Sequence, residues 1–423
     1  MYNKILSSID SVKKLNRHIC NTPNALIMLM IISALVTGSI ISWYAKIQID
    51  NPVTFYDIDG WGHVVRAMQE SDSPVDALKH SYHPHRGTFV PFLFGLSYLI
   101  FRIPESIQIL NIIFQTASVI MLILIFTKFW KMPILGAGIG IIWSAWPHFR
   151  HLYGYYFSEP VAGFFYMLSW FLILKMLYRT NIKNAIFAGG ILGLTIQIKP
   201  SAVLAISGIF LFLLIYFSRS NFKKNLAIFF ISFLVIYSFM PISNYLKFKT
   251  LIPFTLQGSK VLHQGTFIPG DDMPTEHQRT IKEYNKIEAK ENGMSDLEKY
   301  QYYQKLALEQ IFQNPIAQLK LIPKKFLRFW FYVSEYSYLP SLKTFILMTP
   351  LLLAFFYGFA RNYSSRKNII SFCLLTGVWV FHGIIHSEFR YQFYVLPILL
   401  YFSFLGFSQL GPSIFIRERG KRL

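Results

Sequence analysis

Residues 158–200 read SEPVAGFFYMLSWFLILKMLYRTNIKNAIFAGGILGLTIQIKP, which is two apolar runs joined by a short basic turn. The first run is close to the ~20 residues that a helix needs to cross a bilayer, and the second is somewhat shorter. Glu159 stands at the start of the first run, and Lys199 stands at the end of the second, just before a proline that breaks the helix. The stretch therefore predicts two membrane helices whose open ends, bearing an acid and a base, lie on the same side.

The rest of the chain repeats this pattern. Hydrophobic residues make up 53% of the 423-residue chain and charged residues only 15%, which leaves too little polar surface for an ordinary soluble globule. We therefore expect an all-α, polytopic integral membrane protein with about 10–12 transmembrane helices. The apolar runs lie at 25–44, 88–102, 106–127, 133–147, 158–178, 184–199, 201–217, 225–245, 341–360, 369–387 and 391–411.

The basic residues that give the chain its net charge of +20 are placed along the sequence as in a membrane protein. Lysines and arginines fall in short clusters between apolar runs, as the positive-inside rule predicts, so we do not expect nucleic acid as a partner. The N-terminus, the turns LYRTNIKN, SRSNFKK and RNYSSRK, and the tail IRERGKRL should be cytoplasmic. Full crossing by every run would place the two basic termini on opposite sides. Either 88–102 or 133–147 therefore fails to cross, or 106–127 is broken.

Three regions follow from this organisation. Residues 1–246 form an N-terminal transmembrane module that includes an extracytoplasmic loop at 45–87, and residues 341–423 form the C-terminal helices and a basic cytoplasmic tail. Between them, 247–340 is polar and should be an extracytoplasmic loop with an amphipathic helix, since 296–330 has helical spacing suited to a membrane surface. The glycines and prolines spread through 254–274 predict an irregular loop there.

The first loop and a late loop on the extracytoplasmic side are rich in ionisable residues. Their candidate site residues are Asp57, Asp59, His83, His85 and Arg86 in the first loop, and Glu388, Arg390 and Tyr391 in HSEFRY. Ionisable side chains at such depths are costly and usually face a cavity or pair with each other, so together with Glu159 and Lys199 they predict a shared site. Simpler interpretations remain, namely a structural ion pair for Glu159 or Arg390 and a membrane-surface anchor for Lys199. A divalent metal at the histidines is possible.

The order of motifs resembles the GT-C superfamily of polyprenyl-phosphate-dependent glycosyltransferases, in the branch of protein O-mannosyltransferases and lipid A aminoarabinose transferases. DGWGHVVRA resembles the acidic pair of the family's first loop, and HPHRGTFVPF its His-Pro-Pro entry to the second helix. SEPVAGFFYM resembles the helix led by an acidic residue, KPSAVL the Lys-Pro break, QNPIAQL the Asn-Pro segment, and SEFRYQFYVLP the Glu-x-Arg-Tyr start of a late helix. The resemblance covers most of the chain.

This resemblance implies a catalytic aspartate at Asp59. The acid that usually follows it is Gly60 here, which leaves Asp57 as a possible substitute. A carboxylate within reach of the acceptor hydroxyl would act as general base in an inverting displacement, and Glu159 is a further catalytic candidate. Lys199, Arg390 and Arg86 would bind the donor phosphate, and His83, His85, Glu388 and Tyr391 would contact sugar or acceptor. No cofactor is required, because phosphate is already a good leaving group beside cations.

The function expected from the sequence is transfer of a monosaccharide from a polyprenyl-phosphate donor to a glycan, lipid or protein. The active site would face the periplasm or exterior of a bacterial inner membrane. Two alternatives stay open: a transporter or flippase of a lipid-linked substrate, and a polysaccharide polymerase or ligase that uses a pyrophosphate-linked donor. A transporter would work without the carboxylates of the first loop, whereas a glycosyltransferase would need one of them.

Overall fold

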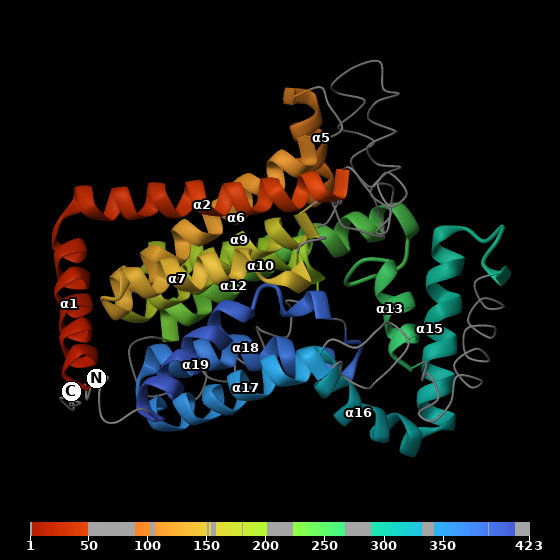
Figure 1. Cartoon of the computed structure of the whole chain (residues 1–423). Helices are drawn as coiled ribbons and strands as arrows, with labels where there is room; N and C mark the ends of the chain where they lie inside the picture. The colour runs from red at the N-terminus through yellow and green to blue at the C-terminus, as the bar shows by residue number, and fades with distance from the viewer. Residues whose placement is uncertain are drawn as a thin grey trace.

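The computed structural model describes residues 2–49, 89–101, 106–149, 152–153, 158–179, 181–200, 223–266, 289–331, 342–387 and 389–410. Over these residues the chain is all-α (Figure 1). The main helices are α1 (Tyr2–Asn21), α2 (Pro23–Ile49), α5 (Phe89–Phe101), α6 (Ser106–Ile125), α7 (Pro133–Ser144), α9 (Glu159–Tyr178), α10 (Ile182–Ile198), α12 (Lys223–Phe248), α13 (Gln257–Thr266), α15 (Asp296–Gln313), α16 (Pro315–Trp330), α17 (Leu342–Asn362), α18 (Arg366–Ile384) and α19 (Leu396–Leu410). The short elements are η2 (Phe126–Trp130), η3 (Pro147–Phe149) and η5 (Phe389–Gln392).

The apolar helices agree with the runs predicted from the sequence. Among the described residues six helices are long and apolar enough to cross a membrane: α2, α6 with η2, α9, α12, α17 and α18. Four shorter apolar helices, α5, α7, α10 and α19, accompany them. Ten predicted runs thus coincide with helices, and the eleventh, 201–217, lies outside the described residues. The chain is therefore an all-α protein of membrane-embedded type.

The bundle has two chemically different ends (Figure 1). At the end shown on the left, which we call the basic end, α1 lies across the start of α7, and the Asn16 Oδ1 atom accepts a hydrogen bond of 3.2 Å from the Ile134 amide. The start of α18 lies there too, because Lys367 Nζ donates to the Phe129 carbonyl at 2.9 Å. Helices α13, α15 and α16 gather at the opposite end, which we call the α13 end.

Close backbone contact fixes the direction of α12. A Cβ atom on Gly189 would lie 2.1 Å from the Phe229 carbonyl oxygen, and one on Gly193 would lie 2.7 Å from the Phe233 carbonyl oxygen. Glycines four residues apart allow two membrane helices to approach this closely. Because both pairs advance along the chain together, α10 and α12 run parallel, and Lys223 lies at the basic end.

Helix α5 differs in direction from the other helices of this stretch. It has 13 residues and measures about 20 Å, but α7 has only 12, so length does not distinguish the two short runs. In Figure 1 α5 projects beyond α2 and does not follow the axis of the bundle, whereas α6 and α7 do. Of the two short runs in this stretch, 88–102 is therefore the one whose helix departs from the axis of the bundle.

The irregular loop predicted at 254–274 is wrong in part, because residues 257–266 form helix α13. Two glycines within it lower intrinsic helix propensity, but tertiary packing overrides that preference. Ser259, His263 and Thr266 are buried on one face of α13, where the His263 ring lies 5.5 Å from that of Tyr303 on α15. Burial lowers the pKa of His263 to about 4, with a smaller contribution from Lys260, so the ring is neutral near pH 7.

The predicted helical segment 296–330 forms two helices, because α15 ends at Gln313 and α16 begins at Pro315. The side chain of Lys325 attaches α16 to the bundle. Its Nζ atom donates hydrogen bonds of 3.0 Å to the carbonyls of Ile384 and Ile385, at the end of α18. Burial lowers the pKa of Lys325 to about 8.

Candidate functional site

The helical hairpin of α9 and α10 brings an acid and a base together at the α13 end. Glu159 begins α9 and is completely buried, and Lys199 caps the end of α10. Lys199 Nζ donates to Glu159 Oε1 at 2.7 Å. Each charge also faces the helix terminus that favours it, since carboxylates are stabilised at helix N-termini and ammonium groups at C-termini. The pair therefore follows directly from the antiparallel hairpin.

A second cation reaches the same carboxylate from the other half of the bundle. Arg390 lies in η5, between α18 and α19, and its Nε atom is 3.9 Å from Glu159 Oε1. The other carboxylate oxygen of Glu159, Oε2, accepts no hydrogen bond from the described residues. Glu159 thus lies behind two cations that come from segments far apart in the sequence.

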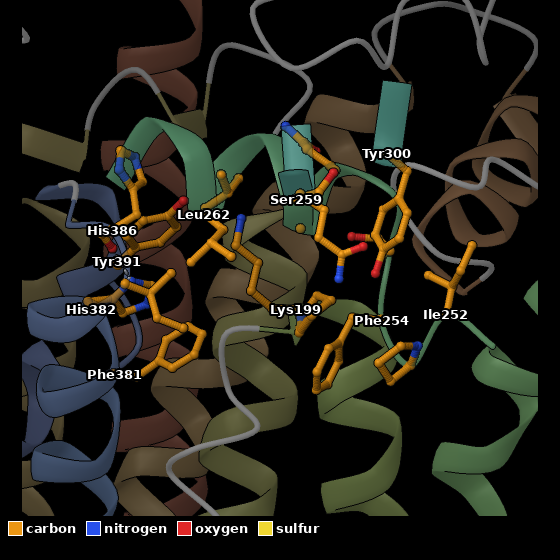
Figure 2. Close-up of a pocket in the computed structure, with 18 of the residues that line it drawn as sticks. Lys199, Ile252, Phe254, Ser259, Leu262, Tyr300, Phe381, His382, His386 and Tyr391 are labelled. Atoms are coloured by element: carbon orange, nitrogen blue, oxygen red, sulfur yellow. Dashed lines mark hydrogen bonds between the residues drawn. The ribbon is translucent and has the colours of Figure 1, made fainter. Parts of the chain in front are cut away.

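Both cations lie on the wall of a cavity of about 320 Å³ (Figure 2). The cavity is bounded by the end of α10, the segment that enters α13, helices α13 and α15, the end of α18, and η5. Much of its lining is apolar, with Ile198, Pro200, Ile252, Pro253, Phe254, Val261, Leu262, Phe381 and Ile385. Glu159 does not line it, so the carboxylate acts on the cavity through Lys199 and Arg390.

Aromatic stacking holds the wall beside these cations. The His382 ring stacks on that of Tyr391 at 4.0 Å between centroids, and Lys199 Nζ lies 5.6 Å from the centroid of the Tyr391 ring. His382 Nδ1 donates to the His386 carbonyl oxygen at 2.8 Å, which fixes the orientation of the imidazole. Tyr391 is therefore held between a histidine and a lysine, with a cation near the face of its ring.

The predicted site residues divide into two groups. Lys199, Arg390 and Tyr391 line the cavity, and Glu159 lies behind the two cations, so these four predicted residues are close together. Asp57, Asp59, His83, His85, Arg86 and Glu388 lie outside the described residues. Within the described ranges no group of three or more His, Cys, Asp or Glu side chains could hold a metal ion.

The sequence interpretation missed the contribution of α13 and α15. Gln257, Ser259, Tyr300 and Gln304 line the same cavity as Lys199. The sequence could have predicted part of this wall, because Tyr300 and Gln304 are four residues apart and so share a face of the predicted amphipathic helix. Helix α13 was not predicted because its two glycines lower the intrinsic helix propensity of the segment.

No protein-family model matches the sequence, and no curated protein matches it significantly. The function is therefore argued from the chemistry of the cavity.

Proposed function

We propose that the protein is a membrane glycosyltransferase that takes a monosaccharide from a polyprenyl-phosphate donor. The observation that carries the proposal is the convergence of Lys199 and Arg390 on one largely apolar cavity at an end of a membrane bundle. A lipid-linked sugar carries its phosphate at the membrane surface and its tail in the bilayer. It therefore needs cations at that depth, next to apolar surface.

The two cations suit a phosphate in different ways. The Arg390 guanidinium offers a planar fork for two phosphate oxygens, and the Lys199 ammonium offers a compact charge. Glu159 keeps both cations oriented and balances part of their charge. Because Glu159 is buried behind the wall, we assign it a positioning role and leave proton abstraction to the first loop.

In the proposed reaction the acceptor hydroxyl attacks the anomeric carbon of the donor. The new carbon–oxygen bond forms as the bond from that carbon to the phosphate oxygen breaks, with inversion of configuration. Asp59 or Asp57 takes the hydroxyl proton as general base. Lys199 and Arg390 stabilise the negative charge that develops on the leaving polyprenyl phosphate.

The basic end of the bundle indicates how the protein is oriented. Lys13, Lys14 and Arg17 of α1, and Arg361, Arg366 and Lys367 around the start of α18, make it the cytoplasmic end by the positive-inside rule. The cavity would then face the outside of the membrane, the periplasm in a bacterial inner membrane. The acceptor would be a glycan, a lipid or a protein on that side.

The test measures transfer of labelled sugar from extracted polyprenyl-phosphate donors in membranes with matched expression. We expect Asp59→Asn or Asp57→Asn to abolish transfer while donor binding remains, because only the base is lost. Arg390→Gln, and the charge-balanced double variant Glu159→Gln with Lys199→Met, should lose donor binding as well. Lys305→Met is the control, since this exposed lysine on α15 does not line the cavity.

Two outcomes would contradict the proposal. Undiminished transfer by both aspartate variants would remove the general base from the first loop. Binding and movement of donor across the membrane without any transfer would favour the transporter alternative.

A further inference from the structure

The cavity is chemically divided. Lys199 and Arg390 both approach Glu159 Oε1, with the rings of Tyr391 and His386 nearby, and we call this part of the lining the cationic end. Helices α13 and α15 contribute the neutral polar side chains of Gln257, Ser259, Tyr300 and Gln304, and we call this part the neutral-polar end. In Figure 2 Lys199 lies between His386 and Tyr391 on one side and Ser259 and Tyr300 on the other.

The neutral-polar end is built by docked helices. Tyr303 and Ala307 are buried on α15, and Lys260 of α13 forms a 3.2 Å ion pair with Glu291, just before α15. With that face of α15 packed against α13, Tyr300 and Gln304 face the cavity from successive turns. At the end of α13, a Cβ atom on Gly265 would lie 1.8 Å from the Ile385 carbonyl oxygen, so the helix touches the end of α18 directly.

These polar groups have hydrogen-bonding capacity to spare. Ser259 Oγ donates to the Leu256 carbonyl at 3.1 Å. The side chains of Gln257, Tyr300 and Gln304 make no hydrogen bond to other described residues. Each amide offers both a donor and an acceptor, and the phenol offers both from one oxygen. Gln257 and Tyr300 are half-buried and Gln304 is exposed, so a ligand with hydroxyl groups that enters the cavity can replace water on all three side chains.

The charge of the lining selects among such ligands. Among the described residues, the neutral-polar end has no aspartate, glutamate, lysine or arginine in its lining, so this end offers no charged partner to a sugar that carries an ammonium or a carboxylate group. A volume of about 320 Å³ lies near the lower limit of small-ligand sites, roughly 300–1,000 Å³, which suits a head group.

We propose that the neutral-polar end binds the hydroxyl groups of an uncharged monosaccharide while Lys199 and Arg390 hold the phosphate to which the sugar is attached. This inference rests on the proposed function and adds the charge class of the sugar. It makes Tyr300, Gln304 and Gln257 determinants of sugar specificity.

The experiment compares two ligands on the purified full-length protein in lipid nanodiscs, polyprenyl phosphate and polyprenyl-phosphate hexose. We expect the sugar to increase affinity in the wild type. The double variant Tyr300→Phe with Gln304→Leu should weaken binding of the hexose-bearing ligand about tenfold and leave that of polyprenyl phosphate unchanged, since only sugar contacts are removed. Gln257→Leu provides a second, independent variant, and Gln301→Leu is the control, because this exposed amide of α15 does not line the cavity.

The outcomes separate the two proposals. If the wild type binds neither ligand, the proposed function fails. If it binds both equally, or if the variants weaken both ligands equally, the phosphate site stands and the sugar site is wrong. A donor with an amino sugar or a sugar acid should bind more weakly than the hexose donor, and stronger binding of either would overturn the neutral assignment.

Discussion

The Glu159 carboxylate combines complete burial with a single close ion pair, and this makes it sensitive to substitution. A buried charge is tolerated only while its partner remains, because the cost of leaving water is offset by the partner's field. Lys199 is also largely buried, with 14% of its side chain exposed.

We predict that Glu159→Gln lowers the free energy of unfolding by about 3–5 kcal/mol, because it leaves Lys199 without its close counterion. Adding Lys199→Met should restore much of that loss without restoring donor binding. Thermal unfolding in detergent, combined into a double-mutant cycle, measures the coupling between the two residues. Equal destabilisation by the single and double variants would mean that the ion pair does not hold the site together.

At the scale of one element, α13 depends on its contact with the end of α18. Gly265 packs so closely on Ile385 that any side chain must displace the helix. Gly258 belongs to the same helix but has open space around it. The pair offers a matched comparison, because both glycine-to-alanine changes raise intrinsic helix propensity by a similar amount.

We predict that Gly265→Ala increases the rate of amide hydrogen exchange across 257–266 and weakens donor binding, because α13 moves away from the cavity. Gly258→Ala should leave exchange unchanged or slower. The two rates are measured on the full-length protein in detergent. Slower exchange in both variants would show that helix propensity dominates and that the contact with Ile385 adds little.

For the whole molecule, orientation in the membrane is the property most open to measurement. Lys183 is exposed in the first turn of α10, at the basic end, and Asn292 is exposed next to Glu291, which pairs with Lys260 of α13. In a chain whose native Cys20 and Cys373 are replaced, Asn292→Cys should react with an impermeant thiol reagent in intact cells. Lys183→Cys should react only after permeabilisation, because basic ends stay in the cytoplasm. The reverse labelling pattern would put the cavity on the cytoplasmic side and refute the proposed location.

Local sequence patterns predicted most of the helices. Long apolar runs such as 158–178 can bury their backbone polar groups in a bilayer only as helices, so hydropathy alone locates them. The hairpin of α9 and α10 also made the meeting of Glu159 and Lys199 predictable, because a short turn returns the chain to the same side. In the same way, Pro200 marked the end of α10, which the structure confirms.

Contacts between segments far apart in the sequence decided which residues form the candidate site. The arrival of Arg390 beside Glu159, the helical state of 257–266 and the placement of Tyr300 on the cavity wall all depend on packing between residues far apart in the sequence. Run 88–102 resembles the other apolar runs in sequence, but its helix projects from the bundle instead of following the bundle axis. The sequence by itself determined an all-α membrane protein with acid and base at one end, because hydropathy and charge act locally. Only the tertiary structure decided which groups share the cavity, because that depends on how the helices pack against each other.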